Sequence, residues 1–342
     1  MGHLQDLSTG LSIPFGWYAV AYSKDLQQKD VQAVNFFGQE LVLFRTESGK
    51  AKLMEPYCPH LGAHLGHGGK VKGESIACPF HAWEIDGTGS VTNIPYAKNM
   101  PKRATEGPCL HAFPIQEMNQ MVWAWYHPNK AAPSFDIIEV PEFSDPNWSE
   151  LDTYEWEINT CLQESGENAV DIAHFVYVHG AADMPRAEVI LNGAHRSTDM
   201  VTRTPRIDEE GNIDMTEMED MHLVTQNFGP GMALQVFARA FKTVMMASMV
   251  PITADRIKLR FAFTKPKDIS EQFNMFTDVL IEEIVRQVGH DIPIWENKIY
   301  RDNPILCDGD GPIAKYRKWF KQFYAEEGEG DTTGRPSLRA IN

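Results

Sequence analysis

The segment CPHLGAHLGHGGKVKGESIACPFH, residues 58–81, differs from the surrounding chain because it is rich in Gly, Cys and His. It begins and ends with a short finger that carries one thiol and one imidazole. The first finger contains Cys58 and His60, and the second contains Cys78 and His81. Thiolates and imidazoles are ligands for zinc and for iron–sulfur clusters. The segment is therefore a predicted metal site.

Two kinds of metal site compete for these fingers. Zinc binds a Cys₂His₂ set tetrahedrally, but zinc fingers usually group the two cysteines together and the two histidines together. Here each finger is mixed, which suits a two-iron cluster whose thiolates bind one iron and whose imidazoles bind the other. The mixed pattern favours a Rieske [2Fe–2S] cluster over zinc. Glycines between the fingers would let backbone N–H groups approach the cluster; they are Gly62, Gly66, Gly68 and Gly69.

A second candidate site lies in ESGENAVDIAHFVYVH, residues 164–179. Asp171 and His174 are three residues apart, so on a helix they lie on one face. His174 and His179 are five apart and converge only if the helix loosens or ends between them. Poor helix formers precede His179, and Gly180 can cap a helix end. On these residues alone, a buried amphipathic helix with two hydrogen-bonded histidines remains an alternative to a metal site.

The bulk composition limits the class of protein. A chain of 342 residues with a formal net charge of −16 is expected to hold two domains and not to bind nucleic acid or an anionic membrane surface. No apolar run approaches the length of a membrane span, and the polar start lacks a signal-peptide core, so we expect a soluble cytoplasmic protein. Five cysteines in a chain of this size do not indicate a disulfide scaffold.

Hydrophobic patterning predicts an α+β protein with two domains. Short aromatic and β-branched runs predict an all-β first domain, residues 1–128, with strands at 16–22, 40–45, 51–55 and 121–126. A proline-spaced connector then leads into a second domain, residues 129–327, with an antiparallel sheet and flanking helices. Its expected elements are strands at 154–161, 232–241, 244–250 and 256–263, and helices at 269–298 and 311–327. Residues 328–342 are expected to form a flexible tail.

The order of the two metal motifs resembles the oxygenase (alpha) component of Rieske non-haem iron oxygenases. The segments DIPIWENK (291–298) and GPIAKYRKWFKQFY (311–324) resemble the subgroup that contains 3-ketosteroid 9α-hydroxylase oxygenases and cholesterol 7-desaturases. The resemblance covers nearly the whole chain. It implies an N-terminal Rieske [2Fe–2S] domain followed by a helix-grip-like catalytic domain that binds a mononuclear Fe(2+).

The resemblance also suggests ligands for this iron. Two histidines and one carboxylate leave open positions on iron(II). His174 and His179 would be the histidines. We expect Asp291 as the carboxylate, with Glu296 and Asp302 as alternatives, and an ordinary exposed helical acid remains an alternative interpretation of each.

Two further residues in the second motif are candidate catalytic residues. Asp171 can support His174 through a hydrogen bond, and the resemblance implies that it also meets His81 of a neighbouring subunit in a homotrimer. Asn168 lies near the iron in related sequences, although a capping or surface role explains it equally well.

The implied activity is that of a Rieske-type monooxygenase in EC class 1.14. A separate NAD(P)H-dependent reductase or ferredoxin would supply electrons, because this sequence contains no G-x-G-x-x-G fingerprint. O₂ and a large apolar substrate, a steroid, would react at the iron. Seven methionines between Met215 and Met249, together with Phe228, Phe237 and Phe241, could line an apolar pocket or simply pack between strands.

Two alternatives to the steroid oxygenase remain. An aromatic-acid hydroxylase or O-demethylase of the same family would need an arginine such as Arg203 or Arg239 facing the substrate. A non-catalytic Rieske electron carrier would not need His174 or His179.

Overall fold

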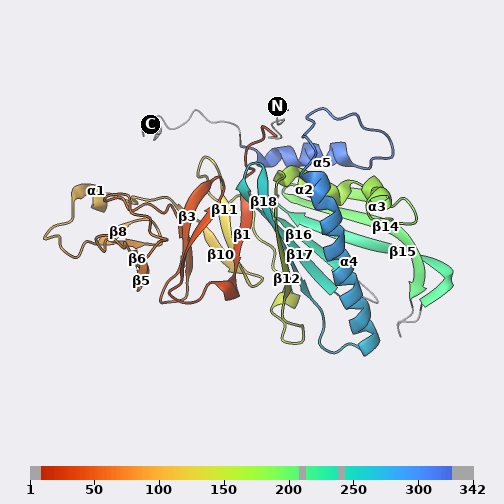
Figure 1. Cartoon of the computed structure of the whole chain (residues 1–342), viewed down its shortest axis with the longest axis horizontal. Coiled ribbons are helices and arrows are strands. Elements are labelled where there is room, and N and C mark those ends of the chain that lie inside the picture. Colours follow the sequence, from red (N-terminus) through yellow and green to blue (C-terminus); the bar gives the residue numbers. More distant parts are fainter. Residues whose placement is uncertain (1–8, 208–212, 238–242, 326–342) are drawn as a thin grey trace, which may run out of the picture.

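The computed structural model describes residues 9–207, 213–237 and 243–325, so the predicted tail, residues 328–342, lies outside the described residues. The described strands form four sheets, and all pairings within them are antiparallel. Figure 1 shows an all-β part at one end of the molecule and, at the other, a large sheet accompanied by helices. The α+β prediction is confirmed.

Three of the sheets belong to the first part of the chain. Two four-stranded sheets have the orders β2-β3-β4-β9 and β5-β6-β7-β8, and a three-stranded sheet has the order β1-β11-β10. Strands β1, β3, β4 and β11 agree with the four predicted strands to within one residue. The bounds are β1 (Gly16–Tyr22), β2 (Val31–Phe36), β3 (Gln39–Arg45), β4 (Ala51–Met54), β5 (Lys70–Lys72), β6 (Ser75–Ala77), β7 (Glu84–Asp86), β8 (Val91–Asn93), β9 (Ala112–Phe113), β10 (Ile115–Met118) and β11 (Met121–Tyr126), with 3₁₀ turn η1 (Ser23–Asp25) and helix α1 (Lys102–Thr105).

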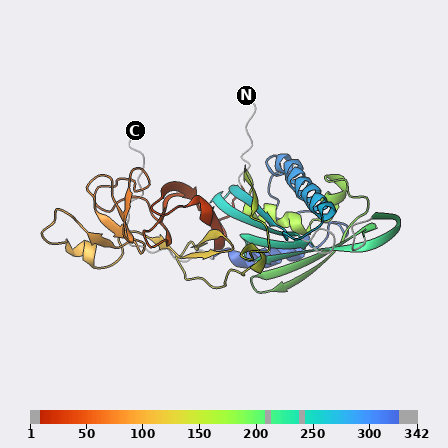
Figure 2. The same ribbon diagram turned by 90° about the horizontal axis from the view of Figure 1, so that it is seen from below.

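The second part is built on a seven-stranded sheet of order β12-β18-β17-β16-β15-β14-β13. Helix α4 lies along one face of this sheet, which confirms the expected helix-grip arrangement (Figures 1 and 2). The bounds are β12 (Asp152–Ile158), β13 (Arg186–Asn192), β14 (His195–Ile207), β15 (Ile213–Phe228), β16 (Met232–Phe237), β17 (Thr243–Thr253), β18 (Arg256–Thr264), α2 (Leu162–Glu167), α3 (Ala173–Tyr177), α4 (Glu271–Trp295) and α5 (Ile313–Phe320), with 3₁₀ turns η2 (Pro141–Phe143), η3 (Asn168–Val170) and η4 (Lys321–Phe323).

Several predicted elements have different ends in the structure, among them the helix predicted at 269–298, which is α4, and the strand predicted at 244–250, which is β17. Two further differences have a local cause. The strand predicted at 154–161 is β12, which ends at Ile158, because the Cys161 side chain caps α2 by accepting a bond from the Glu164 amide. The helix predicted at 311–327 begins only after Gly311, whose φ is +78°, and passes into η4. Residues 326–327 of that prediction lie outside the described residues.

Strand β1 joins the two parts because both of its faces are buried. All seven residues of GWYAVAY are buried, as expected for a continuous apolar strand. One face, with Tyr18, packs in a core that includes Phe263 of β18 and residues of α5. The opposite face, with Trp17, packs beside Trp123 in a core that includes Met246 of β17. The two parts therefore share their hydrophobic cores.

A buried arginine reinforces this junction. Arg260 of β18 is 4% exposed, and its guanidinium donates to the backbone oxygens of Ala19 (2.6 Å) and Val20 (3.3 Å) in β1. Its Nε donates to a Glu155 carboxylate oxygen at 2.5 Å. Because the charge is paired and its donors are bonded, it can be buried at the junction.

Among the described residues, no helix is both long and apolar enough to cross a membrane.

Truncation of Trp123 tests the shared core. Trp123 is fully buried between residues of both parts. We expect Trp123→Ala to lower the free energy of unfolding by about 3–5 kcal/mol and both parts to unfold in one transition, followed by fluorescence and circular dichroism in urea. Met215→Ala is the matched control, because Met215 is 74% exposed; its effect should stay within about 0.5 kcal/mol. Two separate transitions in the wild-type protein would contradict the shared core.

Candidate metal centres

The two cysteine fingers share the same backbone turn. In the first, the Cys58 amide donates to the Ala63 oxygen at 2.9 Å, and the Gly62 amide donates to the Cys58 oxygen at 3.0 Å. The same pair of bonds closes the second finger around Cys78. Gly62 and its counterpart Ala82 both have positive φ, +75° and +54°, so the turn is left-handed at this position. Each finger is thus a closed loop that presents its thiol from a fixed backbone.

Four donor side chains gather between the fingers. The residues Cys58 and Cys78 are 3% and 4% exposed. The imidazole rings of His60 and His81 lie 4.8 Å apart in a T-shaped arrangement. The Nδ1 atoms of both rings are buried and have no hydrogen-bond partner among the described residues. Buried polar atoms are normally paired, so these two nitrogens are suited to bind a metal.

The spacing of these donors separates zinc from a two-iron cluster. A tetrahedral zinc with bonds of about 2.0–2.3 Å holds its four donors within roughly 4 Å of one another. Among the described residues, only His174, His179 and Asp291 place three such donor atoms within 4.8 Å. The four finger donors do not form such a group among the described residues. Two thiols and two imidazoles fit a [2Fe–2S] cluster whose thiolates bind one iron and whose imidazoles bind the other.

Burial raises the pKa of the Cys58 thiol to about 11, and the nearby Cys78 thiol adds to the shift. Amide bonds from His60 and Leu61 to the sulfur act in the opposite direction, since they favour the thiolate. The same amides of His60 and Leu61 would stabilise a metal-bound thiolate.

The backbone break between the two histidines of the second motif is present. Helix α3 ends at Tyr177, and Gly180 has a φ of +76°, so the regular helix stops before His179. The rings of His174 and His179 come within 5.0 Å of each other. The prediction that the helix ends between them is confirmed.

Asp291 enters the same site from helix α4. The buried residues of this helix recur every three, four or seven positions and form one stripe. Asp291 lies on that stripe between Val288 and Trp295, so the helix turns this acid inward. The buried members of the stripe are Phe273, Thr277, Ile281, Val288, Asp291 and Trp295.

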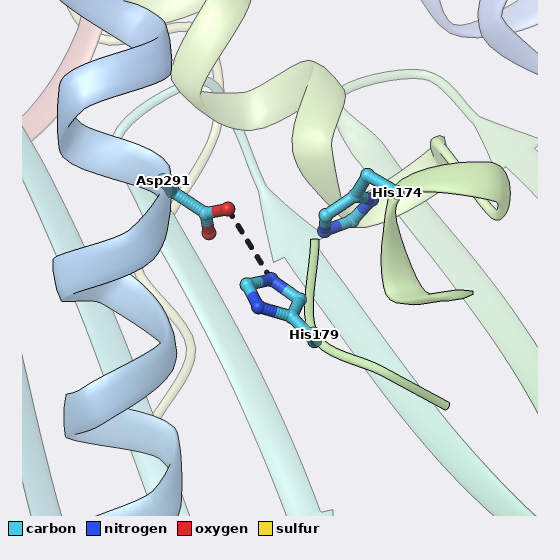
Figure 3. Close-up of side chains that lie close together, drawn as sticks. All are labelled: His174, His179 and Asp291. Carbon is cyan, nitrogen blue, oxygen red and sulfur yellow. Dashed lines mark ion pairs between the residues drawn. The ribbon is translucent and has the colours of Figure 1, made fainter. Parts of the chain in front are cut away.

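Figure 3 shows that the three side chains point toward one another. Nε2 of His179 lies 3.2 Å from Oδ1 of Asp291. The side chains of His174, His179 and Asp291 are 9%, 4% and 9% exposed. Two imidazoles and one carboxylate, close together and largely shielded from water, are donors that could hold a metal ion, and their types suit a non-haem iron(II) site with open positions.

Hydrogen bonds fix the orientation of two of these groups. Nδ1 of His174 donates to the backbone oxygen of Asp171 at 2.5 Å, which leaves the lone pair on Nε2, and this atom is buried without a partner among the described residues. Nδ2 of Asn168 donates to Oδ2 of Asp291 at 3.0 Å. Asn168 is therefore next to the site, and its contact is with the carboxylate.

The Asp171 side chain has a different contact from the one expected. Its nearest carboxylate oxygen is 3.9 Å from Nδ1 of His174, too far for a hydrogen bond, so the support of the imidazole comes from the main-chain oxygen instead. Oδ1 accepts from the amides of Ala173 and His174 at 3.2 and 3.3 Å and so caps α3. The carboxylate is 35% exposed.

Burial favours the neutral forms of these groups. Desolvation raises the pKa of Asp291 to about 7, partly opposed by the bond from Asn168, with Asp171 adding to the increase. Desolvation lowers the pKa of His179 to about 4, and the His174 pKa is also lowered. A bound divalent cation would favour both the ionised carboxylate and the neutral imidazoles.

The alternative carboxylates are in other places. Glu296 accepts hydrogen bonds from the backbone and side-chain nitrogens of Asn159, at 3.1 and 3.0 Å. Asp302 is exposed, in the loop after α4. Neither belongs to the group of donors around His174 and His179.

The sequence did not identify the residues that hold α2, the helix that precedes His174 and His179, in place. Glu167, 8% exposed, is held by Arg317 of α5 through two bonds of 2.6 and 2.9 Å. Gln163 bonds to the hydroxyls of Tyr300 and Tyr324, both at 3.0 Å. The available signal was the pair of acids in α2, which needed a cationic partner to be buried.

The methionines predicted to line a pocket divide into two groups. Met232, Met245, Met246 and Met249 are buried between strands and helices. Met215, Met218 and Met221 lie on the long β15 strand and are 74%, 44% and 38% exposed. Phe228 and Phe237 are partly buried, and Phe241 lies outside the described residues. Core packing thus accounts for the buried group.

The sequence matches two protein-family models. The Rieske [2Fe-2S] domain covers residues 16–114, and the 3-Ketosteroid 9alpha-hydroxylase C-terminal domain covers residues 124–324. The chain is a member of this Rieske oxygenase family. The first match contains both cysteine fingers, and the second contains the histidines and Asp291. The recognised family and its two cofactors, a Rieske cluster and a mononuclear iron, are confirmed.

Relatives and solved structures are consistent with membership of this family. A probable 3-ketosteroid-9-alpha-monooxygenase oxygenase component from Rhodococcus rhodochrous is 29% identical, over 91% of this chain and 80% of the relative. A cholesterol 7-desaturase from Xenopus laevis is 31% identical, over 91% and 72%. Apo dicamba monooxygenase has a TM-score of 0.67 at 16% identity, over 92% of this chain and 97% of the other, and Pseudomonas putida NdmA with caffeine has 0.68 at 18%, over 89% of each. These two structures show that the fold is shared.

Removal of the Asp291 carboxylate tests the second centre. We expect Asp291→Ala to lose the mononuclear iron and keep the visible and EPR spectra of the Rieske cluster, because the fingers lie in another part of the fold. Iron analysis against protein concentration measures the loss. Glu296→Ala is the matched control from the end of the same helix and should retain all iron. If Asp291→Ala keeps its full iron content, another residue supplies the carboxylate.

Proposed function

We propose that this oxidoreductase is the terminal oxygenase of a steroid-hydroxylating system that receives electrons from a separate NAD(P)H-dependent reductase or ferredoxin. The observation that carries the proposal is the buried triad of His174, His179 and Asp291 on a chain that also holds the Rieske fingers. A simple electron carrier would have no use for the triad. The relatives named 3-ketosteroid monooxygenase components support the substrate class.

Each group of residues has a separate part in this function. When bound, the cluster would supply electrons singly, and iron(II) would activate O₂ beside the substrate. His174, His179 and Asp291 would hold the iron. Asn168 would orient the Asp291 carboxylate through its 3.0 Å bond. The low exposure of the triad would keep bulk water from the reacting atoms.

The site residues proposed for the cluster are Cys58, His60, Cys78 and His81. The proposed cluster ligands lie in the expected Rieske domain, residues 1–128, and the proposed iron ligands lie in the expected catalytic domain, residues 129–327. The two family matches, over 16–114 and 124–324, are consistent with this boundary.

The aromatic-acid alternative gains no support from a specific contact. Arg203 is exposed on β14 and donates to the backbone oxygen of Met218 on the neighbouring strand. Arg239 lies outside the described residues. We therefore retain the steroid as the proposed substrate.

Electron transfer between the centres is proposed to cross a subunit boundary. Figure 1 places β5 to β8, beside the cysteine fingers, at the opposite end of the molecule from α3, next to the triad. A head-to-tail homotrimer would bring the fingers of one subunit to the triad of the next, through a heterologous interface that closes on itself. Oδ1 of Asp171 is used inside the chain, but the carboxylate is 35% exposed and could accept a bond from His81 of a neighbour.

Product analysis tests the proposed reaction. We expect an oxygenated steroid when the iron-loaded protein is incubated with a panel of 3-ketosteroids, O₂ and a surrogate reductase, detected by mass spectrometry with ¹⁸O₂. Binding of these steroids should be micromolar or tighter, at about 25 cal/mol per Å² of buried apolar surface. Benzoate is the control and should bind weakly. Turnover of small aromatic acids without any response to steroids would contradict the proposal, and a desaturated product would correct the reaction type.

The variant Asp171→Asn tests the bridge between subunits. It keeps the size of the side chain and the α3 cap but removes the charge. We expect both metals to stay bound and the reductase to reduce the cluster, while product formation falls roughly 10- to 100-fold. Near-normal turnover would mean that Asp171 acts only as the α3 cap seen within the chain.

A further inference from the structure

One aromatic side chain outside the ligand set contacts the cluster fingers directly. The indole of Trp83 is stacked on the imidazole of His60, with ring centroids 4.7 Å apart and an angle of 4° between the planes. Its Nε1 donates to the hydroxyl of Tyr96 at 2.8 Å. Stacking on His60 and the hydrogen bond to Tyr96 therefore fix the orientation of the Trp83 indole.

The same indole borders a cavity of about 430 Å³. Its lining also includes Pro59 from the first finger, and Arg103, Glu106 and Cys109 from α1 and the turn after it. The cavity is partly open to solvent. It is therefore a recess on the surface, one side chain away from His60.

The lining of this recess carries one cation, Arg103, and one acid, Glu106. The exposed chain segment to which both belong is basic in an acidic protein. Between Tyr96 and Glu106 there are three cations, Lys98, Lys102 and Arg103, and one acid, Glu106, a local balance of +2 in a chain of −16. Lys102 is 88% exposed and forms a surface pair with Glu106 at 3.3 Å. Arg103 is exposed and has no ion pair with another described residue. A partner with an acidic surface would be attracted here and repelled by most of the remaining surface.

We propose that this face is where the separate electron donor docks, with an acidic surface around its redox cofactor placed over the recess and against Trp83. The proposal rests on the proposed function, which requires such a donor. In the docked complex one electron leaves the reduced donor, which is oxidised by one electron, and the Rieske cluster is reduced by that electron; no bond forms or breaks. The His81 side remains available for a neighbouring subunit.

Paired charge changes on this face test the docking. The probe is a plant-type [2Fe–2S] ferredoxin, kept reduced by its NADPH reductase, and stopped-flow absorbance follows reduction of the cluster. At low ionic strength we expect Arg103→Glu to slow the second-order rate on the order of tenfold and Glu106→Lys to increase it. Both differences should shrink at about 1 M salt, where the Debye length is about 3 Å. Lys318→Glu, an exposed charge on α5, is the control and should change the rate little.

A second readout separates docking from damage to the cluster. Photoreduced 5-deazariboflavin, a neutral reductant, should reduce the cluster of every variant at the same rate, and the midpoint potentials should agree. Equal ferredoxin rates for Arg103→Glu, Glu106→Lys and wild type would overturn the proposal. So would slowing by the neutral reductant, or a change of oligomeric state in Arg103→Glu, which would assign the face to a contact between copies.

Separate variants test whether electrons pass from the donor to the cluster through the Trp83 ring. Trp83→Phe keeps a ring against His60, whereas Trp83→Leu removes it. We expect the limiting rate at saturating ferredoxin to fall for Trp83→Leu and to be largely kept by Trp83→Phe, with the midpoint potential unchanged in both. An equal limiting rate in all three proteins would remove Trp83 from the electron path.

The proposed function can be checked independently of this face. Arg103→Glu, reduced chemically and then mixed with steroid and O₂, should still form product in a single turnover. Product formed this way with unchanged ferredoxin rates would refute the docking site alone. Absence of product in the wild-type protein would count against the proposed function.

Discussion

Asp291 and His179 hold a carboxylate oxygen and an imidazole nitrogen 3.2 Å apart where solvent barely reaches. Burying an acid without a cation is unfavourable, which is why its pKa rises to about 7. The catalytic part of the fold is arranged to sustain this contact. The apolar stripe of α4 turns Asp291 inward, Asn168 bonds to its second oxygen, and the helix break at Gly180 brings His179 back toward His174. A bound divalent cation would stabilise the ionised Asp291 carboxylate, which burial alone disfavours.

The Rieske fingers also bury their donor groups, but backbone turns and amides hold these groups in place. Their donors are fixed by two equivalent backbone turns, and the neighbouring amides favour the thiolate of Cys58. The two parts of the chain are not independent bodies, because β1 contributes to two cores and Arg260 bonds across the junction. The fingers and the triad therefore belong to one packed chain but lie near opposite ends of the molecule (Figure 1).

Much of this arrangement could be predicted from local sequence. The mixed fingers indicate a cluster because ligand type and spacing are present in one short segment. Asp291 was expected from the family resemblance, and the buried stripe of α4 that carries it is seen only in the structure. What escaped prediction depends on residues distant in the chain. Arg317 and Glu167 are 150 positions apart, and nothing in either segment identifies its partner. The role of the Asp171 backbone oxygen was missed for another reason: spacing places side chains, whereas the bond to His174 comes from the main chain.

Mixed oligomers test the central proposal, that the cluster of one subunit would serve the iron of the next. Cys78→Ser should lack a functional cluster and Asp291→Ala should lack the mononuclear iron, so each protein alone should be inactive. Co-assembly of the two, with distinct affinity tags to isolate mixed species, places an intact cluster beside an intact iron only across a subunit boundary. We predict that the mixed oligomers recover product formation. Inactive mixed oligomers with correct metal content would contradict transfer between subunits.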